Sequence, residues 1–271
     1  MNLKNVTKLT RITKPKKLGD KLLILATAPC VSRFFESEKV REQFKDYDLA
    51  FINSMVLESE DWLHEYKPRY LIFLDGWFLY DNEFGVGVKN EFKSRLENIL
   101  DKITWECYLV TPILSELKVN NPHIQCIYLN ILSSKYSSKK KWLYKNNLMI
   151  PGANNVVMGA IYFGITFEYK EIGLLGFTYR TDNDFCMEED GLHGEDYAHY
   201  YDLDVHPYVV KNEEIFDKNG ECFLLRQTKR QLVSTQILCD LANYAKDCGT
   251  VVTNYTPKSR IDMFRYKKLE Q

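Results

Sequence analysis

Short apolar runs alternate with amphipathic and polar segments along most of this chain. The runs have the length of buried parallel strands, and we predict strands at residues 21–26, 48–53, 70–75, 105–110, 123–129, 172–176 and 250–254. The apolar spacing between them predicts helices at 37–44, 61–66, 88–103, 156–167 and 230–245, and a last helical turn at 259–266. Because strands and helices alternate, we expect an α/β fold: a single Rossmann-like domain with a mostly parallel sheet flanked by helices.

Two segments depart from this alternation. Residues 1–20 are basic and polar and contain Pro15, so we interpret them as an N-terminal arm. Residues 180–225 are acidic, aromatic and rich in His, and they are too long for an ordinary connection between two elements. We therefore expect one domain over residues 21–271 that includes a lid insertion at 180–225.

Small polar residues follow three of the predicted strands. Thr27, Asn53 and Asp75 stand at these strand ends, and Ala28 and Pro29 continue the first loop. The carboxyl ends of parallel strands meet at one edge of a sheet, where α/β proteins bind their ligands. The sequence therefore predicts a ligand crevice at this edge. The first loop lacks the Gly-x-Gly-x-x-Gly pattern of nicotinamide-binding proteins.

The segment 151–179 predicts a second part of this crevice. Asn154 and Asn155 precede an apolar helix as capping residues, and Gly176 closes the strand that follows. Free N–H groups and the helix dipole favour an anion at such a helix start, so a phosphate-bearing ligand fits there. An ordinary helix cap without a ligand would give the same pattern.

Composition narrows the class of protein. The hydrophobic share of 45% and the charged share of 27% are typical of a globular domain, and the net charge of −1 does not indicate nucleic-acid binding. The 7 Cys residues lack zinc spacing and fit reduced thiols in the cytoplasm. No apolar run is long enough for a transmembrane helix. The basic arm is either a solvated segment or a peripheral contact with an anionic membrane.

Four segments, in their order along the chain, resemble a family of bacterial sialyltransferases. These enzymes transfer sialic acid from CMP-sialic acid onto cell-surface lipooligosaccharide. The resemblance lies in LLILATAPCVS at 22–32, DLAFINSM at 48–55, MGAIYFGITFEYKEIGLLGFTY at 158–179 and LANYAKDCGTVVTNYTPKSRIDMF at 241–264. It implies a Rossmann-like, GT-A-like glycosyltransferase domain with a mobile lid and no metal cofactor.

The resemblance also implies the reaction and the partners. We expect an inverting transfer of sialic acid or a related acid sugar from a CMP-activated donor to a glycan acceptor. The acceptor would belong to a lipooligosaccharide, an O-antigen or a capsule, and the enzyme would work in the cytoplasm or at the inner membrane. The family forms tetramers, so a homo-oligomer is consistent with the resemblance.

Matched position by position, the resemblance implies a nucleotide site. Thr27 falls on an Asn of the family's nucleotide loop, and Asn53 falls on the Asn that binds the cytosine or ribose. Asp75 falls on another Asn near the donor, and Asn155 falls on a Thr beside the cytidine. We therefore predict that the nucleotide is bound by Thr27, Ala28, Pro29, Asn53, Asp75, Asn154, Asn155, Gly176 and Tyr179.

The catalytic residues are expected in the predicted lid. Arg180 stands where the family has a Tyr ligand of the donor phosphate, and a guanidinium pairs well with phosphate. The family's catalytic His has no counterpart in residues 223–229. Imidazole is suited to proton transfer near neutrality, and we predict His199 as the base because hydroxyls and carboxylates flank it in the sequence, with the hydroxyls of Tyr200 and Tyr201 near the phosphate.

Other functions stay open on the sequence. Asp182 and Asp184 form an Asp-x-Asp pair that could hold a metal for a UDP-sugar transferase. The lid histidines His193, His199 and His206 could be ordinary polar residues or a zinc set. A nucleotidyl or pyrophosphokinase-like enzyme and a non-catalytic nucleotide- or glycan-binding module are further alternatives.

Overall fold

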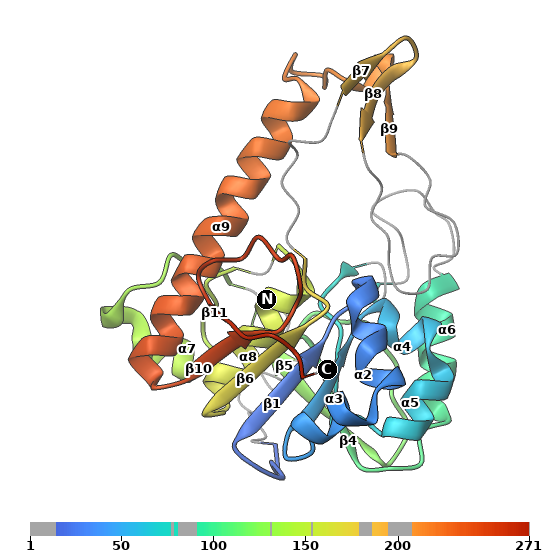
Figure 1. Ribbon diagram of the computed structural model, residues 1–271, viewed down its shortest axis with the longest axis vertical. Helices are drawn as coiled ribbons and strands as arrows, with labels where there is room; N and C mark the ends of the chain where they lie inside the picture. Colours follow the sequence, from blue (N-terminus) through green and yellow to red (C-terminus); the bar gives the residue numbers. More distant parts are fainter. Residues whose placement is uncertain are drawn as a thin grey trace.

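A parallel β-sheet forms the centre of the molecule (Figure 1). The computed structural model describes residues 15–76, 79–80, 91–130, 132–152, 154–178, 186–194 and 208–270. In these residues the sheet has eight strands in the order β11-β10-β6-β1-β2-β3-β4-β5, and every neighbouring pair is parallel. The strands are β1 (Lys21–Leu25), β2 (Asp48–Ile52), β3 (Tyr70–Ile72), β4 (Cys107–Pro112), β5 (Ile124–Leu129), β6 (Glu171–Leu175), β10 (Val251–Asn254) and β11 (Arg265–Tyr266). The predicted α/β fold with a mostly parallel sheet is confirmed.

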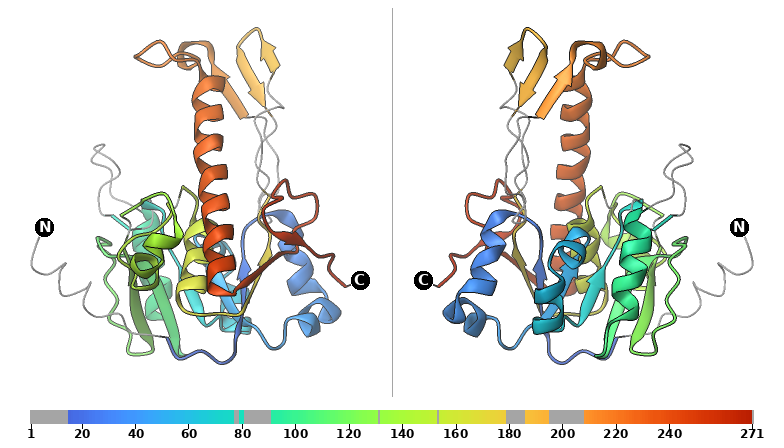
Figure 2. Two further views of the ribbon diagram at one scale, coloured as in Figure 1. Left: turned by 90° about the vertical axis from the view of Figure 1, so that its left-hand side faces the viewer. Right: turned by 90° about the vertical axis from the view of Figure 1, so that its right-hand side faces the viewer.

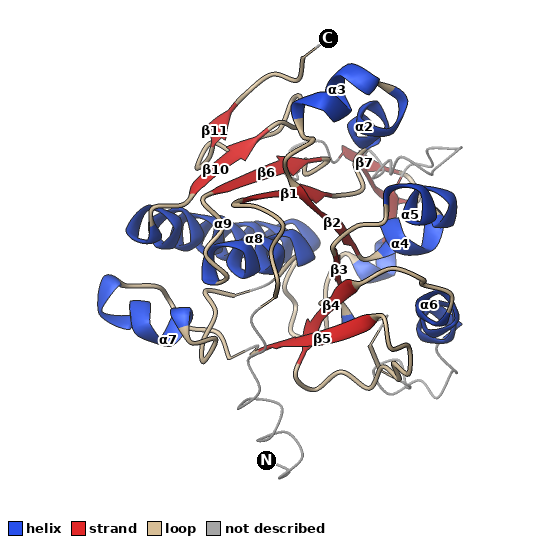
Figure 3. Ribbon diagram, turned by 90° about the horizontal axis from the view of Figure 1, so that it is seen from below, coloured by secondary structure: helices blue, strands red, loops and turns tan. Residues whose placement is uncertain are grey.

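Helices cover both faces of this sheet, as Figure 3 shows from below. One face carries α2 (Ser32–Glu36), α3 (Glu38–Gln43), α4 (Ser54–Glu58), α5 (Glu60–Tyr66) and α6 (Glu91–Asp101). The other face carries α7 (Lys141–Lys145), α8 (Val156–Thr166) and α9 (Phe223–Cys248). Short 3-10 turns lie at η1 (Pro29–Val31), η3 (Ser138–Lys140) and η4 (Asn212–Glu214).

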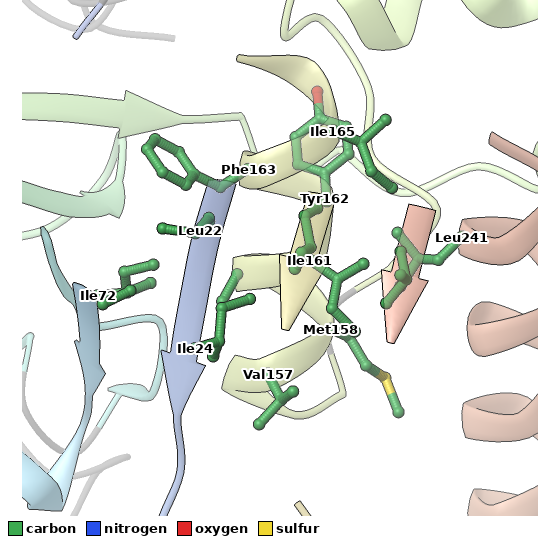
Figure 4. Close-up of a cluster of buried hydrophobic side chains, with 14 of the residues drawn as sticks. Leu22, Ile24, Ile72, Val157, Met158, Ile161, Tyr162, Phe163, Ile165 and Leu241 are labelled. Atoms are coloured by element: carbon green, nitrogen blue, oxygen red, sulfur yellow. The ribbon is translucent and has the colours of Figure 1, made fainter. Parts of the chain in front are cut away.

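The alternation of side chains along β1 explains the two-layered core. Leu22 and Ile24 point toward α8 and α9, whereas Leu23 and Leu25 point toward the helices of the opposite face. Helix α8 is apolar on every side and almost entirely buried, as expected for a helix packed between a sheet and another helix. Figure 4 shows Val157 beside Ile24 and Ile165 toward the Leu22 end. Helix α8 therefore begins at the carboxyl edge of the sheet.

A second, smaller sheet lies within the predicted lid segment. It consists of β7 (Cys186–Glu188), β8 (Gly191–Gly194) and β9 (Tyr208–Lys211), which pair antiparallel. Its buried residues Leu192 and Val210 pack against Phe223, the first residue of α9. Figures 1 and 2 show this sheet beyond the large sheet, with the first half of α9 reaching up to it. Its role as a lid remains a prediction.

Several local predictions are corrected by the structure. Helix α9 begins at Phe223 rather than at residue 230, and Phe223 packs against the small sheet. The prediction missed this start because the first turns of α9 carry no helical pattern of buried residues. The last helical turn predicted at 259–266 is wrong, since Arg265 pairs with Thr253 at the free edge of β10. Helices α2, α4 and α7 are absent from the prediction because five residues are too few to show a period. No helix in the described ranges combines the length and the apolar character that crossing a bilayer requires.

Candidate functional site

The direction of the strand order reverses at β1. From β1 the chain adds β2, β3, β4 and β5 on one side, and it later adds β6, β10 and β11 on the other. The carboxyl ends of β1 and β6 therefore mark a topological switch point of the sheet. Open α/β sheets bind their ligands in the crevice outside such a switch point.

The β1 and β6 loops are hydrogen-bonded to each other at their start. The Ala26 N–H donates to the Leu175 carbonyl at 2.8 Å, and the Ala28 N–H donates to the Gly176 carbonyl at 3.0 Å. Gly176 has a φ of 84°, and a Cβ there would lie 2.8 Å from the Ala26 carbonyl oxygen. Only glycine fits this position without displacing the β1 loop. The predicted residues Thr27, Ala28 and Gly176 are thus held together.

Asn53 is the most unusual residue of this edge. Its backbone has φ 42° and ψ −125°, which is a strained conformation for any residue other than glycine. Backbone hydrogen bonds maintain it, because the Asn53 N–H donates to Ile72 and the Asn53 carbonyl accepts from Val56, both at 3.1 Å. The side-chain Oδ1 of Asn53 is buried and has no hydrogen-bond partner among the described residues. Such a combination of strain and an unmet acceptor is typical of a binding site.

Pairing registers place the other predicted strand ends next to Asn53. Leu25 of β1 pairs with Phe51 of β2, so Thr27 and Asn53 occupy corresponding places two residues further along. Ile52 pairs with Ile72, and Asp75 follows as an exposed residue. Gly176, Thr27, Asn53 and Asp75 therefore lie along four adjacent strand ends.

The start of α8 adds the two asparagines. Asn155 is the N-cap, and its Oδ1 accepts a hydrogen bond from the Val157 N–H at 2.8 Å, as the sequence predicts. Asn154 instead points toward α9, where its amide lies 3.4 Å from the Ser234 hydroxyl. The two residues consequently face different surroundings, although both lie at the carboxyl edge.

A cavity of about 660 Å³ opens at this edge beyond β3, β4 and β5. Among the predicted site residues that the structure describes, Asn154 lines the cavity. Leu74 also lines the cavity, and Asp75 is the next residue along the chain. Helix α9 forms the far wall of the cavity. On it the Gln236 amide donates to Asp240 Oδ1 at 3.1 Å, and the backbone N–H of Tyr136 donates to Asp240 Oδ2 at 3.0 Å. The cavity joins apolar walls with a few polar groups, which is typical of ligand sites.

One part of the site was not predicted from the sequence. The Phe177 N–H donates to Thr256 Oγ1 at 3.1 Å, and the Ser259 hydroxyl donates to the Phe177 carbonyl at 3.2 Å. Asn254, at the end of β10, accepts from the Thr256 N–H, and its own Nδ2 is buried without a partner in the described ranges. The loop after β10 thus fixes the loop after β6. Asn254 is a fourth polar strand end, and this signal could have identified it.

The predicted catalytic residues lie outside the described residues. This applies to Arg180, His199, Tyr200 and Tyr201, to the nucleotide residue Tyr179, and to Asp182, Asp184 and His206. The remaining lid histidine, His193, lies on β8 with its Nε2 2.5 Å from Asp190 Oδ1, and this hydrogen bond lowers the pKa of Asp190. Within the described ranges, no group of three or more His, Cys, Asp or Glu side chains is placed to hold a metal ion.

Comparisons with known proteins give no relative for this chain: no protein-family model, curated protein or solved structure matches it.

Proposed function

We propose that this protein is an inverting glycosyltransferase that uses a CMP-activated acid sugar, sialic acid or a relative, and a surface glycan as acceptor. The observation that carries the proposal is Asn53, whose strained backbone presents a buried, unpartnered amide oxygen beside the switch point. A cytosine amino group or a ribose hydroxyl is a hydrogen-bond donor that would satisfy this oxygen. The resemblance of the ordered segments to the sialyltransferase family supports the same ligand.

The proposed roles of the other residues follow from their positions. The β1 loop with Thr27 and Ala28, tied to Gly176, would bind the nucleotide next to Asn53. The start of α8 at Asn155 favours the negative charge of the phosphate. The cavity along α9 is large enough for a monosaccharide next to the nucleotide.

In the proposed reaction an acceptor hydroxyl oxygen attacks the anomeric carbon of the donor sugar. The new glycosidic bond forms as the bond from that carbon to the phosphate oxygen breaks, and CMP leaves with the electron pair. His199 would take the hydroxyl proton, and Arg180 would stabilise the phosphate that departs. This single displacement inverts the configuration at the anomeric carbon.

A nucleotide screen followed by a turnover assay tests the proposal. Thermal shift is measured with CMP, CDP, UDP, GDP and ATP, each with EDTA or with manganese, because a ligand of the folded state raises the Tm. CMP should raise the Tm in EDTA, and CMP-sialic acid should release CMP when a glycan acceptor is added. Stabilisation by UDP only with manganese, or by ATP alone, would contradict the proposed donor.

A further inference from the structure

A lysine-rich surface lies on η3 and α7, whose residues do not line the cavity of the candidate site. Between Glu116 and Glu168 the sequence contains no acidic residue, and five lysines occur between positions 135 and 145. The last four of these lysines belong to η3 and α7, at the edge of the molecule next to α8 and α9 (Figure 3). We name the face formed by Lys139, Trp142 and Lys145 the α7 face.

The spacing along η3 and α7 creates this face. Lys139, Trp142 and Lys145 follow one another at intervals of three, so they lie on one side of the turns. All three side chains are exposed, and Trp142 is 65% accessible. Tyr144 points the other way and is fully buried. Several other large apolar side chains are equally exposed, and what distinguishes Trp142 is its place between two exposed lysines on the same side of the turns.

The interior side of α7 is firmly anchored. The Tyr144 hydroxyl donates to the Ser134 carbonyl, and its ring lies 5.1 Å from that of Tyr136 and 5.5 Å from that of Tyr244. The Tyr136 hydroxyl and the Ser138 hydroxyl donate to Asp247 Oδ2 at 2.8 and 2.7 Å. These contacts hold the outward residues in one place, so the α7 face is a preformed surface.

The charge of the α7 face is largely uncompensated. Among the described residues, Lys139 and Lys145 form no ion pair with a carboxylate. The Ser138 and Tyr136 hydroxyls and, after them, the charges of Lys141 and Lys246 lower the pKa of Asp247, so this carboxylate balances lysines other than Lys139 and Lys145. Next to Lys145, Lys17 and Lys170 line a polar hollow of about 320 Å³ that also contains Asp20 and Glu168. Lys17 pairs with Asp20 there at 3.2 Å, so three lysines face two carboxylates and the hollow has a small positive excess.

We propose that the α7 face is a docking surface for an anionic lipid bilayer, with Trp142 placed among the headgroups and the lysines facing their phosphates. The chemistry of both components fits this partner. Lysines near a bilayer that contains acidic lipids are attracted to its negative surface potential, and Trp is enriched at the depth of the headgroups. Single-stranded nucleic acid is bound along a basic groove by several aromatic side chains that stack on successive bases, whereas the α7 face offers the one indole of Trp142 between two lysines, which favours the bilayer. This proposal does not rest on glycosyl transfer.

Vesicle sedimentation with the full chain tests the proposal. The protein is mixed with phosphatidylcholine vesicles or with vesicles that also contain phosphatidylglycerol, and the bound fraction is measured. We expect binding to the anionic vesicles only, and weaker binding as salt is added. Lys139→Ala/Lys145→Ala should reduce the partition coefficient roughly 25-fold, about fivefold for each cation removed. Trp142→Ala should reduce it as well.

A matched control and a spectroscopic measurement exclude a general charge effect. Lys118→Ala/Lys218→Ala removes the same charge from exposed positions elsewhere and should leave vesicle binding unchanged. Brominated lipids should quench part of the tryptophan fluorescence, and this part should disappear in Trp142→Phe. The proposal would be overturned by equal binding to neutral and anionic vesicles, or by an equal loss of vesicle binding in both double variants. Binding of a single-stranded oligonucleotide by a protein that does not bind vesicles would also overturn it.

Discussion

Replacing Asn53 by glycine tests both the strain and the ligand role of this residue. Relief of the φ 42°, ψ −125° conformation should yield about 1–3 kcal/mol, and the greater freedom of glycine in the unfolded chain should cost about 0.5–1 kcal/mol. The lost amide also removes a buried acceptor that has no partner in the described part of the chain. We expect a net stabilisation of about 1–2 kcal/mol, or a Tm higher by roughly 2–6 °C.

The same substitution should weaken the candidate site. Loss of the Oδ1 acceptor removes one ligand hydrogen bond, so the Kd for CMP should rise by about tenfold or more in calorimetric titration. Asn53→Ala should weaken CMP equally but lack the gain in Tm, because a Cβ keeps the strain. A Tm of Asn53→Gly at or below that of the native protein would refute the strain, and an unchanged Kd would refute the ligand role.

Asn147 provides a control for this experiment. It also has a positive φ, of 53°, but its side chain is fully used within the protein. Its Nδ2 donates to the Tyr128 carbonyl at 2.7 Å, and its Oδ1 accepts from the Asn130 N–H at 3.2 Å. Asn147→Gly should therefore lower the Tm while leaving CMP binding unchanged. If both glycine variants shifted the Tm in the same direction, backbone strain would not explain the effect at Asn53.

Two further predictions concern the β1 and β6 loops. Gly176→Ala should destabilise the protein by about 1–3 kcal/mol in denaturant unfolding, because its Cβ would meet the Ala26 carbonyl oxygen in addition to the positive φ. Gly220 also has a positive φ, of 76°, but a Cβ there would meet no atom within 4 Å, so Gly220→Ala should lower the free energy of unfolding by less than Gly176→Ala does. Equal losses of stability in the two variants would contradict the clash. Burial raises the pKa of the Cys30 thiol, so little thiolate is present near neutrality and alkylation of Cys30 should be slow. The alkylation rate should increase at higher pH, and bound CMP should decrease it. Mass spectrometry should show that the exposed Cys186 is labelled faster than Cys30. Equal labelling rates of the two thiols, or a Cys30 rate that CMP does not change, would count against the proposed nucleotide loop.

The sequence alone was sufficient for the class of fold and for most of the large sheet. Buried parallel strands are continuous apolar runs, so β1, β2 and β6 are visible without their partners, and the apolar length of α8 identifies a helix buried on all sides. Polar residues at strand ends indicated the edge of the candidate site, because parallel strands all end on one side. The N-cap at Asn155 was equally local, since the cap and the amide it binds are two residues apart.

Only the tertiary structure decided features that depend on distant partners. The strain of Asn53 arises because Ile72 and Val56 hold its backbone, and no propensity of asparagine indicates it. Thr256 became part of the site through a hydrogen bond to Phe177, 79 positions away. Residues 265 and 266 form a strand because the edge of β10 supplies the hydrogen bonds that a short polar segment cannot provide for itself. Local pattern determines which segment becomes a strand or a helix, whereas strain, pairing at edges and the meeting of loops are properties of the assembled chain.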